Sequence, residues 1–298
     1  MSLSILTILG KVLLTLVFIV VITVILSIAA AVIAILKQPE LERSMAAVAG
    51  DSFFVKAALW AQIIGFISGV FLSYGIFERR KGWTLGLQSR HLARRLGEGF
   101  VAGALLITVS CLGIWLLGGI NVRSNSWTES MLAELVGGFL LFIGVAVNEE
   151  LFARGYLQGL VKERFGGAAA ITISTLVFAF LHSFNPGMWN TPMPLLNLIL
   201  AGLLFGLSRE LSKGLWMPIG MHLSWNFIQG CIFGFQVSGT PMPSIFKVQD
   251  QGSALLSGGS FGAEGSLVTM IILVVGILLV MSYYGQPTRR QTYKKSLS

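Results

Sequence analysis

The sequence predicts an all-α protein, a polytopic transmembrane helix bundle with about eight spans. Of its 298 residues, 54% are hydrophobic and only 11% are charged, whereas an average soluble domain has about 25% charged residues. The apolar residues form long runs, and most Lys and Arg residues lie between those runs. A helix of about 20 apolar residues is long enough to cross a bilayer. We therefore expect an integral protein of the plasma (inner) membrane.

Eight apolar segments are candidates for these spans. They are residues 12–36, 53–77, 99–118, 132–160, 168–184, 195–209, 215–236 and 266–284. The first segment is longer than the roughly 7–15-residue apolar core of a signal peptide, so we expect it to remain as an uncleaved span. Cys111 and Cys231 lie inside two of the segments without a CxxC partner, which predicts buried, reduced thiols.

The chain divides into three regions. They are N-terminal spans at 1–131, a core at 132–236, and a loop, last span and basic tail at 237–298. Residues 84–98 place leucines on one helical face and arginines elsewhere, which predicts an amphipathic helix at the membrane interface. We expect His91 in that helix to be solvated rather than catalytic. The stretch 237–265 is rich in Gly, Ser and Pro, which predicts a flexible loop.

The positive charges predict the orientation of the spans. With eight spans and a cytoplasmic N-terminus, all but five of the 21 Lys and Arg residues fall on the cytoplasmic side. The five exceptions are Lys37, Arg43, Lys56, Arg123 and Lys247. Because cytoplasmic loops carry the excess of Lys and Arg, we expect both termini in the cytoplasm. The net charge of +8 has the same origin, so we expect membrane lipids and no nucleic acid as partners.

The middle of the fourth span contains three charged residues close together, which are costly in a bilayer and usually mark function. Its sequence at 148–154 is NEELFAR. Glu150 and Arg154 are one turn apart, with the glutamate first, which favours an ion pair. That pair has either a structural or a chemical role. Glu149 lies about 100° around the helix from Glu150 and has no cation nearby in sequence, which suits a general base.

The fifth span ends in a histidine at the same depth as Glu149. Glu149 and His182 lie equally far in sequence from the turn expected at Gly166 and Gly167. In an antiparallel hairpin of two helices, both residues are then roughly 25 Å from that turn. A histidine that only fills the core is the alternative to a functional one.

The seventh span carries His222 and Asn226 one helical turn apart. Two hydrogen-bond donors on one face can stabilise a developing oxyanion, and a polar stripe for helix packing is the alternative. His222 follows Gly214 by only eight residues, so it should lie shallower than Glu149. The two groups can still meet if the preceding loop dips into the bundle or if a funnel opens to the cytoplasm.

These segments resemble the three signatures of the CAAX-protease and bacteriocin-processing (CPBP, or Abi) intramembrane endopeptidases. The signatures are EExxxR at 149–154, FxxxH at 178–182 and HxxxN at 222–226. The resemblance covers about 132–236. It implies an eight-helix bundle with a cavity open to the cytosol. It also implies an activity similar to that of type II CAAX prenyl endopeptidases, which would cut a peptide bond near the cytoplasmic membrane face.

The resemblance also implies a role for each matching residue. Glu149 and His182 would activate a water molecule, and His222 and Asn226 would stabilise the oxyanion. The residues that would support or line the site are Glu150, Arg154 and Phe178. The implied substrate is a peptide or a lipidated protein, either a CAAX-type prenylated protein or a bacteriocin-like precursor.

A metal ion is an open question at this stage. Two histidines and a glutamate can bind zinc, and the family has been described both as metalloproteases and as glutamate-dependent enzymes. The chain has no HExxH motif, and Asn226 is an unusual zinc ligand. We favour a mechanism without a metal or another cofactor. A zinc ion on Glu149, His182 and His222 is the alternative.

Two other classes of function compete with the protease. A proton-coupled membrane transporter also needs ionisable residues within its spans, because buried Glu and His residues form proton relays. A non-catalytic immunity or scaffold protein would keep the bundle without using the chemistry. The sequence has no feature that specifies the oligomeric state or the substrate.

Overall fold

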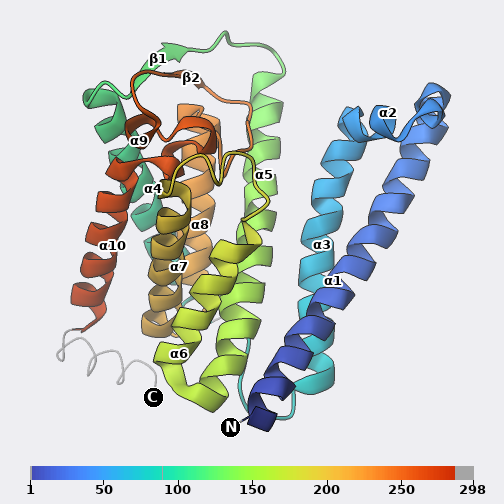
Figure 1. Ribbon diagram of the computed structural model, residues 1–298, viewed down its shortest axis with the longest axis vertical. Coiled ribbons are helices and arrows are strands. Elements are labelled where there is room, and N and C mark those ends of the chain that lie inside the picture. Colours follow the sequence, from blue (N-terminus) through green and yellow to red (C-terminus); the bar gives the residue numbers. More distant parts are fainter. Residues whose placement is uncertain (1, 89, 286–298) are drawn as a thin grey trace.

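The computed structural model describes residues 2–88 and 90–285, which form a bundle of long helices (Figure 1). The long helices are α1 (Ser2–Lys37), α3 (Ser52–Phe77), α4 (Leu92–Leu116), α5 (Met131–Glu150), α6 (Gln158–Leu181), α7 (Met193–Ser212), α8 (Trp216–Phe227) and α10 (Leu267–Gly285). The π-helical segment η2 (Leu151–Leu157) joins α5 to α6, and η3 (Ile228–Phe233) continues α8. The predicted all-α fold is confirmed, apart from one small sheet.

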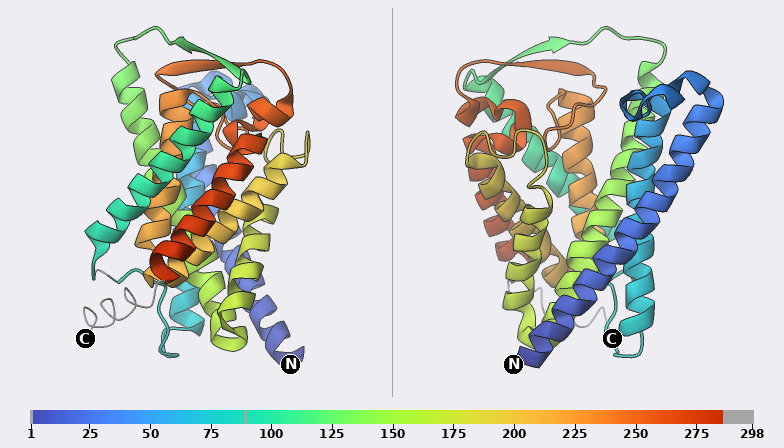
Figure 2. Two further views of the ribbon diagram at one scale, coloured as in Figure 1. Left: turned by 90° about the vertical axis from the view of Figure 1, so that its left-hand side faces the viewer. Right: turned by 45° about the vertical axis from the view of Figure 1, so that its right-hand side comes forward.

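The short elements gather at one end of the bundle, which we call the strand end (Figures 1 and 2). They are η1 (Pro39–Arg43), α2 (Met45–Gly50), β1 (Ile120–Ser124), β2 (Phe246–Asp250), α9 (Ala254–Ser257), η4 (Gly259–Phe261) and η5 (Ala263–Gly265). β1 and β2 pair antiparallel, with Val122 opposite Val248. The start of α1 lies at the other end, which we call the Gly166 end.

Six segments of the described chain are long and apolar enough to cross a membrane. They are Ile5–Lys37, Ser52–Phe77, Leu92–Leu116, Met131–Leu181, Met193–Ser212 and Leu267–Tyr284. Large apolar side chains such as Leu105 and Leu278 are 60% exposed on the outside of the bundle. A soluble monomer rarely exposes an apolar surface of this extent, so the chain is an integral membrane protein.

The segment Met131–Leu181 doubles back on itself at Gly166. Gly166 has φ 81° and ψ 175° inside an otherwise helical stretch, a conformation that favours glycine. The turn predicted there is confirmed, and α5 and α6 form the two arms of a hairpin (Figure 1). The shorter α8 packs against α4, α5 and α7. The prediction of about eight spans stays a prediction, because α8 is not among the six segments.

Glycines let α4 and α8 pack with their backbones in contact. A Cβ atom at Gly99 would lie 2.0 Å from the carbonyl oxygen of Met217, and one at Gly220 would lie 2.2 Å from that of Leu96. Small residues allow this close packing between membrane helices. The contact fixes the depth of α8, and therefore the depth of His222.

The hairpin of α1 and α3 is tied to the Gly166 end by a buried carboxylate. Glu78, which follows α3, is fully buried and pairs with Lys11 and Lys81. Its Oε2 atom also accepts a hydrogen bond from Trp83 Nε1 at 3.1 Å. Figure 1 shows the hairpin diverging from the other helices toward α2.

The prediction of an amphipathic helix at 84–98 is wrong in extent. Residues 84–88 are not helical, and α4 begins only at Leu92, after His91 in a left-handed conformation. The backbone of Gly86 instead accepts a hydrogen bond from Leu215 N at 2.9 Å. This contact with the turn before α8 competes with local helix formation. His91 is exposed, as expected.

The prediction of a flexible loop at 237–265 is also wrong. This stretch contains β2, α9 and two 3₁₀ turns, and it packs over the strand end (Figure 2). Phe261 is only 1% exposed, so the segment has its own contact with the core. Gly, Ser and Pro serve here as turn residues between short ordered elements.

Replacing Gly99 by Ala should destabilise the bundle by about 1–3 kcal/mol, because the new methyl group overlaps a backbone oxygen. Gly97 is the matched control on the same helix, since a Cβ there meets nothing within 4 Å. Gly97→Ala should leave stability unchanged or raise it by up to about 1 kcal/mol. Thermal unfolding in detergent measures both. Equal melting of the two variants would contradict the close contact of α4 and α8.

Candidate active site

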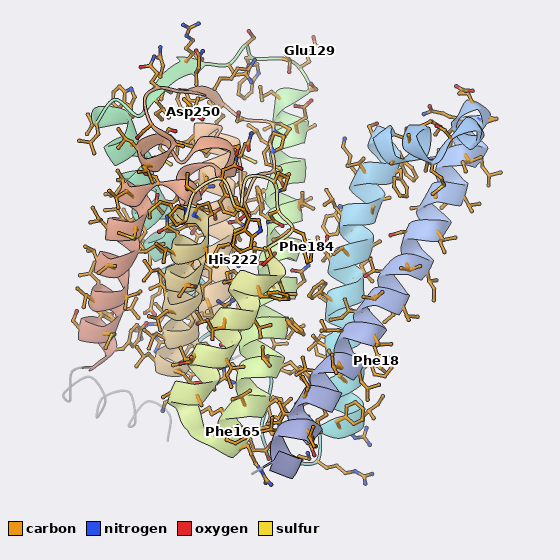
Figure 3. All side chains as sticks on the ribbon, viewed as in Figure 1. Phe18, Glu129, Phe165, Phe184, His222 and Asp250 are labelled. Carbon is orange, nitrogen blue, oxygen red and sulfur yellow. The ribbon has the colours of Figure 1, made fainter. Side chains whose placement is uncertain are left out.

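Glu149, His182 and His222 meet in the interior of the bundle, where Figure 3 labels His222. The Nε2 atom of His182 lies 3.8 Å from Oε2 of Glu149. The Nε2 atom of His222 lies 3.9 Å from the same oxygen. The prediction that Glu149 and His182 lie at one depth is therefore confirmed, and His222 joins them from α8.

These three side chains line a cavity of about 410 Å³. Asn226 and Phe178 line it as well, so the cavity contains all four residues predicted to be catalytic. Its walls come from α3, α5 to α8, residues 237–242 and the start of α10. Leu59 of α3 and Leu181 of α6 lie on its rim and are 38% and 37% exposed. The cavity therefore reaches the lipid-facing surface between these two helices.

Hydrogen bonds on the far side of each ring orient both imidazoles. Nδ1 of His182 donates to the carbonyl oxygen of Phe178 at 2.8 Å. Nδ1 of His222 donates to Oε1 of Glu150 at 3.0 Å. In a neutral ring, Nε2 then carries a lone pair toward Glu149, and in the imidazolium form of His222 it is a second donor. Oε2 of Glu149 is buried without a hydrogen-bond partner, so one water molecule can donate to this oxygen and to a ring nitrogen.

Glu150 and Arg154 form the predicted ion pair at the start of η2. Arg154 Nη1 donates to Glu150 Oε1 at 3.0 Å, and both side chains are fully buried. Nη2 of Arg154 also donates to the carbonyl oxygen of Gly202 at 3.2 Å. The guanidinium carbon lies 4.2 Å from the ring centre of Phe178 and 5.4 Å from that of Phe205. Such π-helical segments often occur at functional sites.

Two aromatic rings hold the histidines in place. Phe205 stacks on His222, with ring centres 5.1 Å apart and planes 20° apart. Phe178 contacts His182 at 4.7 Å. The role expected for Phe178 in lining the site agrees with this contact. Phe205 was missed, and no pattern in its span distinguishes it from other apolar residues.

Asn197 and Glu264, which also line the cavity, were missed too. Asn197 is a polar residue inside a predicted span, and Glu264 is an acidic residue just before the last span. The rule that flags ionisable and polar residues near spans, applied to them, would have found both.

Asn226 lies one turn after His222 on α8 and is 5% exposed. The depth of these two residues follows from the turn between α7 and α8, which ends short of the Gly166 turn (Figure 1). Leu215 in that turn is fully buried and bonds to the backbone of Gly86. Of the two alternatives, the structure supports a loop that dips into the bundle.

The cavity occupies the half of the bundle nearer the strand end. Its lining there includes Ser238 and Thr240. Toward the Gly166 end, Arg154, Tyr156 and Leu157 are at most 2% exposed and fill the interior. The Lys and Arg distribution places the Gly166 end in the cytoplasm, and therefore places the cavity in the half of the membrane away from the cytoplasm. The resemblance instead implies a cavity open to the cytosol, so these two expectations exclude each other.

No group of three or more His, Cys, Asp or Glu side chains among residues 2–88 and 90–285 has a geometry that could hold a metal ion. Cys111 and Cys231 are both buried and free, as predicted.

The comparisons with known proteins bear on the same core. Residues 130–228 match the family model "Type II CAAX prenyl endopeptidase Rce1-like". The resemblance seen in the three motifs is thereby confirmed over this part of the chain. The chain is also similar to an Escherichia coli protein described as "Uncharacterized 24.3 kDa protein". The two are 23% identical over 181 residues, which cover 58% of this chain and 77% of that protein.

Replacing Arg154 by Met should destabilise the protein by about 3–5 kcal/mol, because Glu150 is left as a buried, uncompensated charge. Glu149→Gln is the control, since Glu149 has no ion pair with Arg or Lys and its side chain is 28% exposed. It should change stability much less. Thermal unfolding of the purified proteins in detergent measures both. Equal stability of Arg154→Met and the unaltered protein would contradict a structural role for the pair.

Proposed function

We propose, from the premise that residues 130–228 form an Rce1-like domain of the CAAX-type intramembrane proteases, that this protein is an intramembrane endopeptidase. It hydrolyses a peptide bond with a water molecule held by Glu149 and His182. One observation carries the proposal. The buried Oε2 atom of Glu149 has no hydrogen-bond partner and faces two imidazole nitrogens, at 3.8 and 3.9 Å.

Glu149 acts as the general base in this mechanism. It takes a proton from the water while the water oxygen attacks the carbonyl carbon of the scissile bond. His182, oriented by Phe178, holds the same water through Nε2. Glu149 then passes the proton to the nitrogen of the leaving amine, so that protons balance over the cycle.

His222 and Asn226 stabilise the negative charge that develops on the carbonyl oxygen. With both ring nitrogens protonated, His222 donates Nδ1–H to Glu150 and Nε2–H to the oxyanion. The side-chain amide of Asn226 donates a second hydrogen bond from the next turn of α8. Donors held in place before the reaction are effective because the protein does not reorganise during the step. Glu150, Arg154 and Phe205 keep the imidazole in position.

The mechanism needs no metal or other cofactor, since the base and the oxyanion donors come from the chain itself. The substrate reaches the cavity through the membrane, between α3 and α6. We propose a peptide or a lipidated protein as substrate. The two substrate classes are CAAX-type prenylated proteins and peptide precursors of the bacteriocin kind.

The packing of the interior argues against a transporter. Toward the Gly166 end the interior is filled by Arg154, Tyr156 and Leu157, which leaves a proton relay no continuation there.

Replacing Glu149 by Gln should lower kcat for peptide cleavage by about 10²–10⁴-fold, the usual contribution of a general base. The variant should still fold, because the amide has nearly the shape of the carboxyl group. Glu134→Gln is the control, on an exposed turn of the same helix. Cleavage of lipidated and unlipidated peptides by protein in proteoliposomes is the measurement. Full activity of Glu149→Gln would eliminate the proposed base.

Treatment with a strong zinc chelator, followed by dialysis, should leave the rate of cleavage unchanged. The physical reason is that the proposed base, Glu149, and the proposed oxyanion donors, His222 and Asn226, act without a Lewis acid. The same treatment of a known zinc protease serves as the positive control. Loss of activity that zinc alone restores would show instead that Glu149, His182 and His222 bind a metal ion.

Cysteine labelling in intact cells decides between the two conflicting orientations. Because Lys and Arg predict a cytoplasmic Gly166 end, Glu163→Cys should be protected from a membrane-impermeant thiol reagent and Ser126→Cys should react. Both positions are exposed, and the native cysteines are buried. The cut then lies in the half of the membrane away from the cytoplasm. The opposite labelling would return it to the cytoplasmic half.

A further inference from the structure

The cavity has a second polar region, formed by Glu264, Asn197 and Ser238. All three residues line the cavity that contains Glu149. Asn197 comes from α7, while Ser238 and Glu264 come from the segment that covers the strand end (Figure 2). Glu264 and Ser238 lie outside the residues that match the family model, and the mechanism above uses none of the three.

Asn197 presents a buried acceptor that no group among the described residues satisfies. Its Nδ2 atom donates to the carbonyl oxygens of Glu264 at 2.7 Å and Ser266 at 2.9 Å. Because both partners are acceptors, the orientation of the amide is fixed. Oδ1 is then the acceptor, and it is buried with no hydrogen-bond partner, in a side chain only 2% exposed. A buried acceptor of this kind is costly unless a ligand or water donates to it.

The carboxylate of Glu264 is held by one oxygen. Its Oε2 atom accepts hydrogen bonds from Ser238 N and Ser238 Oγ, each at 2.8 Å. This contact fixes the side chain and leaves Oε1 for a ligand in the cavity. Oε1 of Glu264 and Oδ1 of Asn197 are both acceptors, so the group that satisfies them must donate hydrogen bonds.

The charge of the cavity agrees with a cationic ligand. Glu149 and Glu264 are the acidic residues in its described lining, which includes no Lys or Arg. Arg154 lies outside the lining and is paired with Glu150. The two carboxylates outnumber the protonated His222 of the proposed mechanism, so the cavity attracts a positive group.

We propose that Glu264 and Asn197 form a subsite for a Lys or Arg side chain of the peptide that is cut. The inference rests on the proposed endopeptidase function and names the substrate class. It is a peptide with a basic residue at a fixed distance from the scissile bond. The charge on the substrate pairs with Glu264, and one of its N–H groups donates to Asn197.

Binding tests the subsite without requiring cleavage. The Glu149→Gln protein in nanodiscs is titrated with fluorescent peptides of one sequence that carry Lys, norleucine or Glu at each position in turn. At one position, Lys should improve binding over norleucine by about tenfold, the effect of one charge-assisted hydrogen bond. Adding Glu264→Gln should remove that preference, and adding Glu264→Lys should shift it to the Glu peptide.

Two control variants separate charge from structure. Ser238→Ala removes the hydroxyl bond to Glu264 but keeps the charge, so it should keep most of the preference for Lys. Glu134→Gln removes an exposed acid of α5 outside the cavity lining and should change nothing. Thermal unfolding of each variant shows whether it is folded.

The outcomes distinguish this inference from the proposed function. Equal binding of the Lys and norleucine peptides at every position, or a preference for Lys that survives Glu264→Gln, would overturn the subsite. If the protein with its native Glu149 binds the Lys peptide preferentially but cuts none of the peptides, the endopeptidase is refuted and the subsite stands. Cleavage that favours Lys at the same position, through kcat/KM, would support both.

Discussion

The buried ion pair between Glu150 and Arg154 is the interaction on which the rest of the site depends. Two opposite charges are tolerable inside a membrane protein only when each is compensated. Arg154 pairs with Glu150, donates to the carbonyl oxygen of Gly202 and lies over two aromatic rings. Oε1 of Glu150 accepts hydrogen bonds from both Arg154 and His222. The pair therefore joins α5, α7 and α8, and it orients one of the two imidazoles.

The neighbouring Glu149 is the chemical counterpart of this structural pair. The two carboxylates are adjacent in the chain, but the helix turns them by about 100° relative to each other. Glu150 points to an arginine, while Glu149 points into a cavity with two histidines. Each carboxylate has one oxygen without a hydrogen-bond partner, but Glu150 is paired with Arg154, whereas the unpartnered Oε2 of Glu149 faces two imidazoles. This difference in environment assigns them different roles, although the sequence motif contains both.

The cavity is shaped as much by the strand end as by the three core motifs. The segment at 237–265 covers it, supplies Glu264 and Ser238, and closes the space above Glu149. The opposite end is filled by large buried side chains such as Tyr156. As a result, the cavity opens toward the lipid between α3 and α6. Its acidic interior is the basis of the proposed selection of a cationic residue.

The sequence alone determined the elements that follow from hydropathy, helical geometry and local spacing. Apolar runs specify the long helices, Gly166 specifies the hairpin, and equal spacing from that turn places His182 level with Glu149, because a helix rises by a constant amount per residue. The tertiary structure decided the depth of α8, the stacking of Phe205 and the position of Glu264. These depend on close backbone packing and on contacts between residues far apart in the chain, for which one sequence carries no periodic signal.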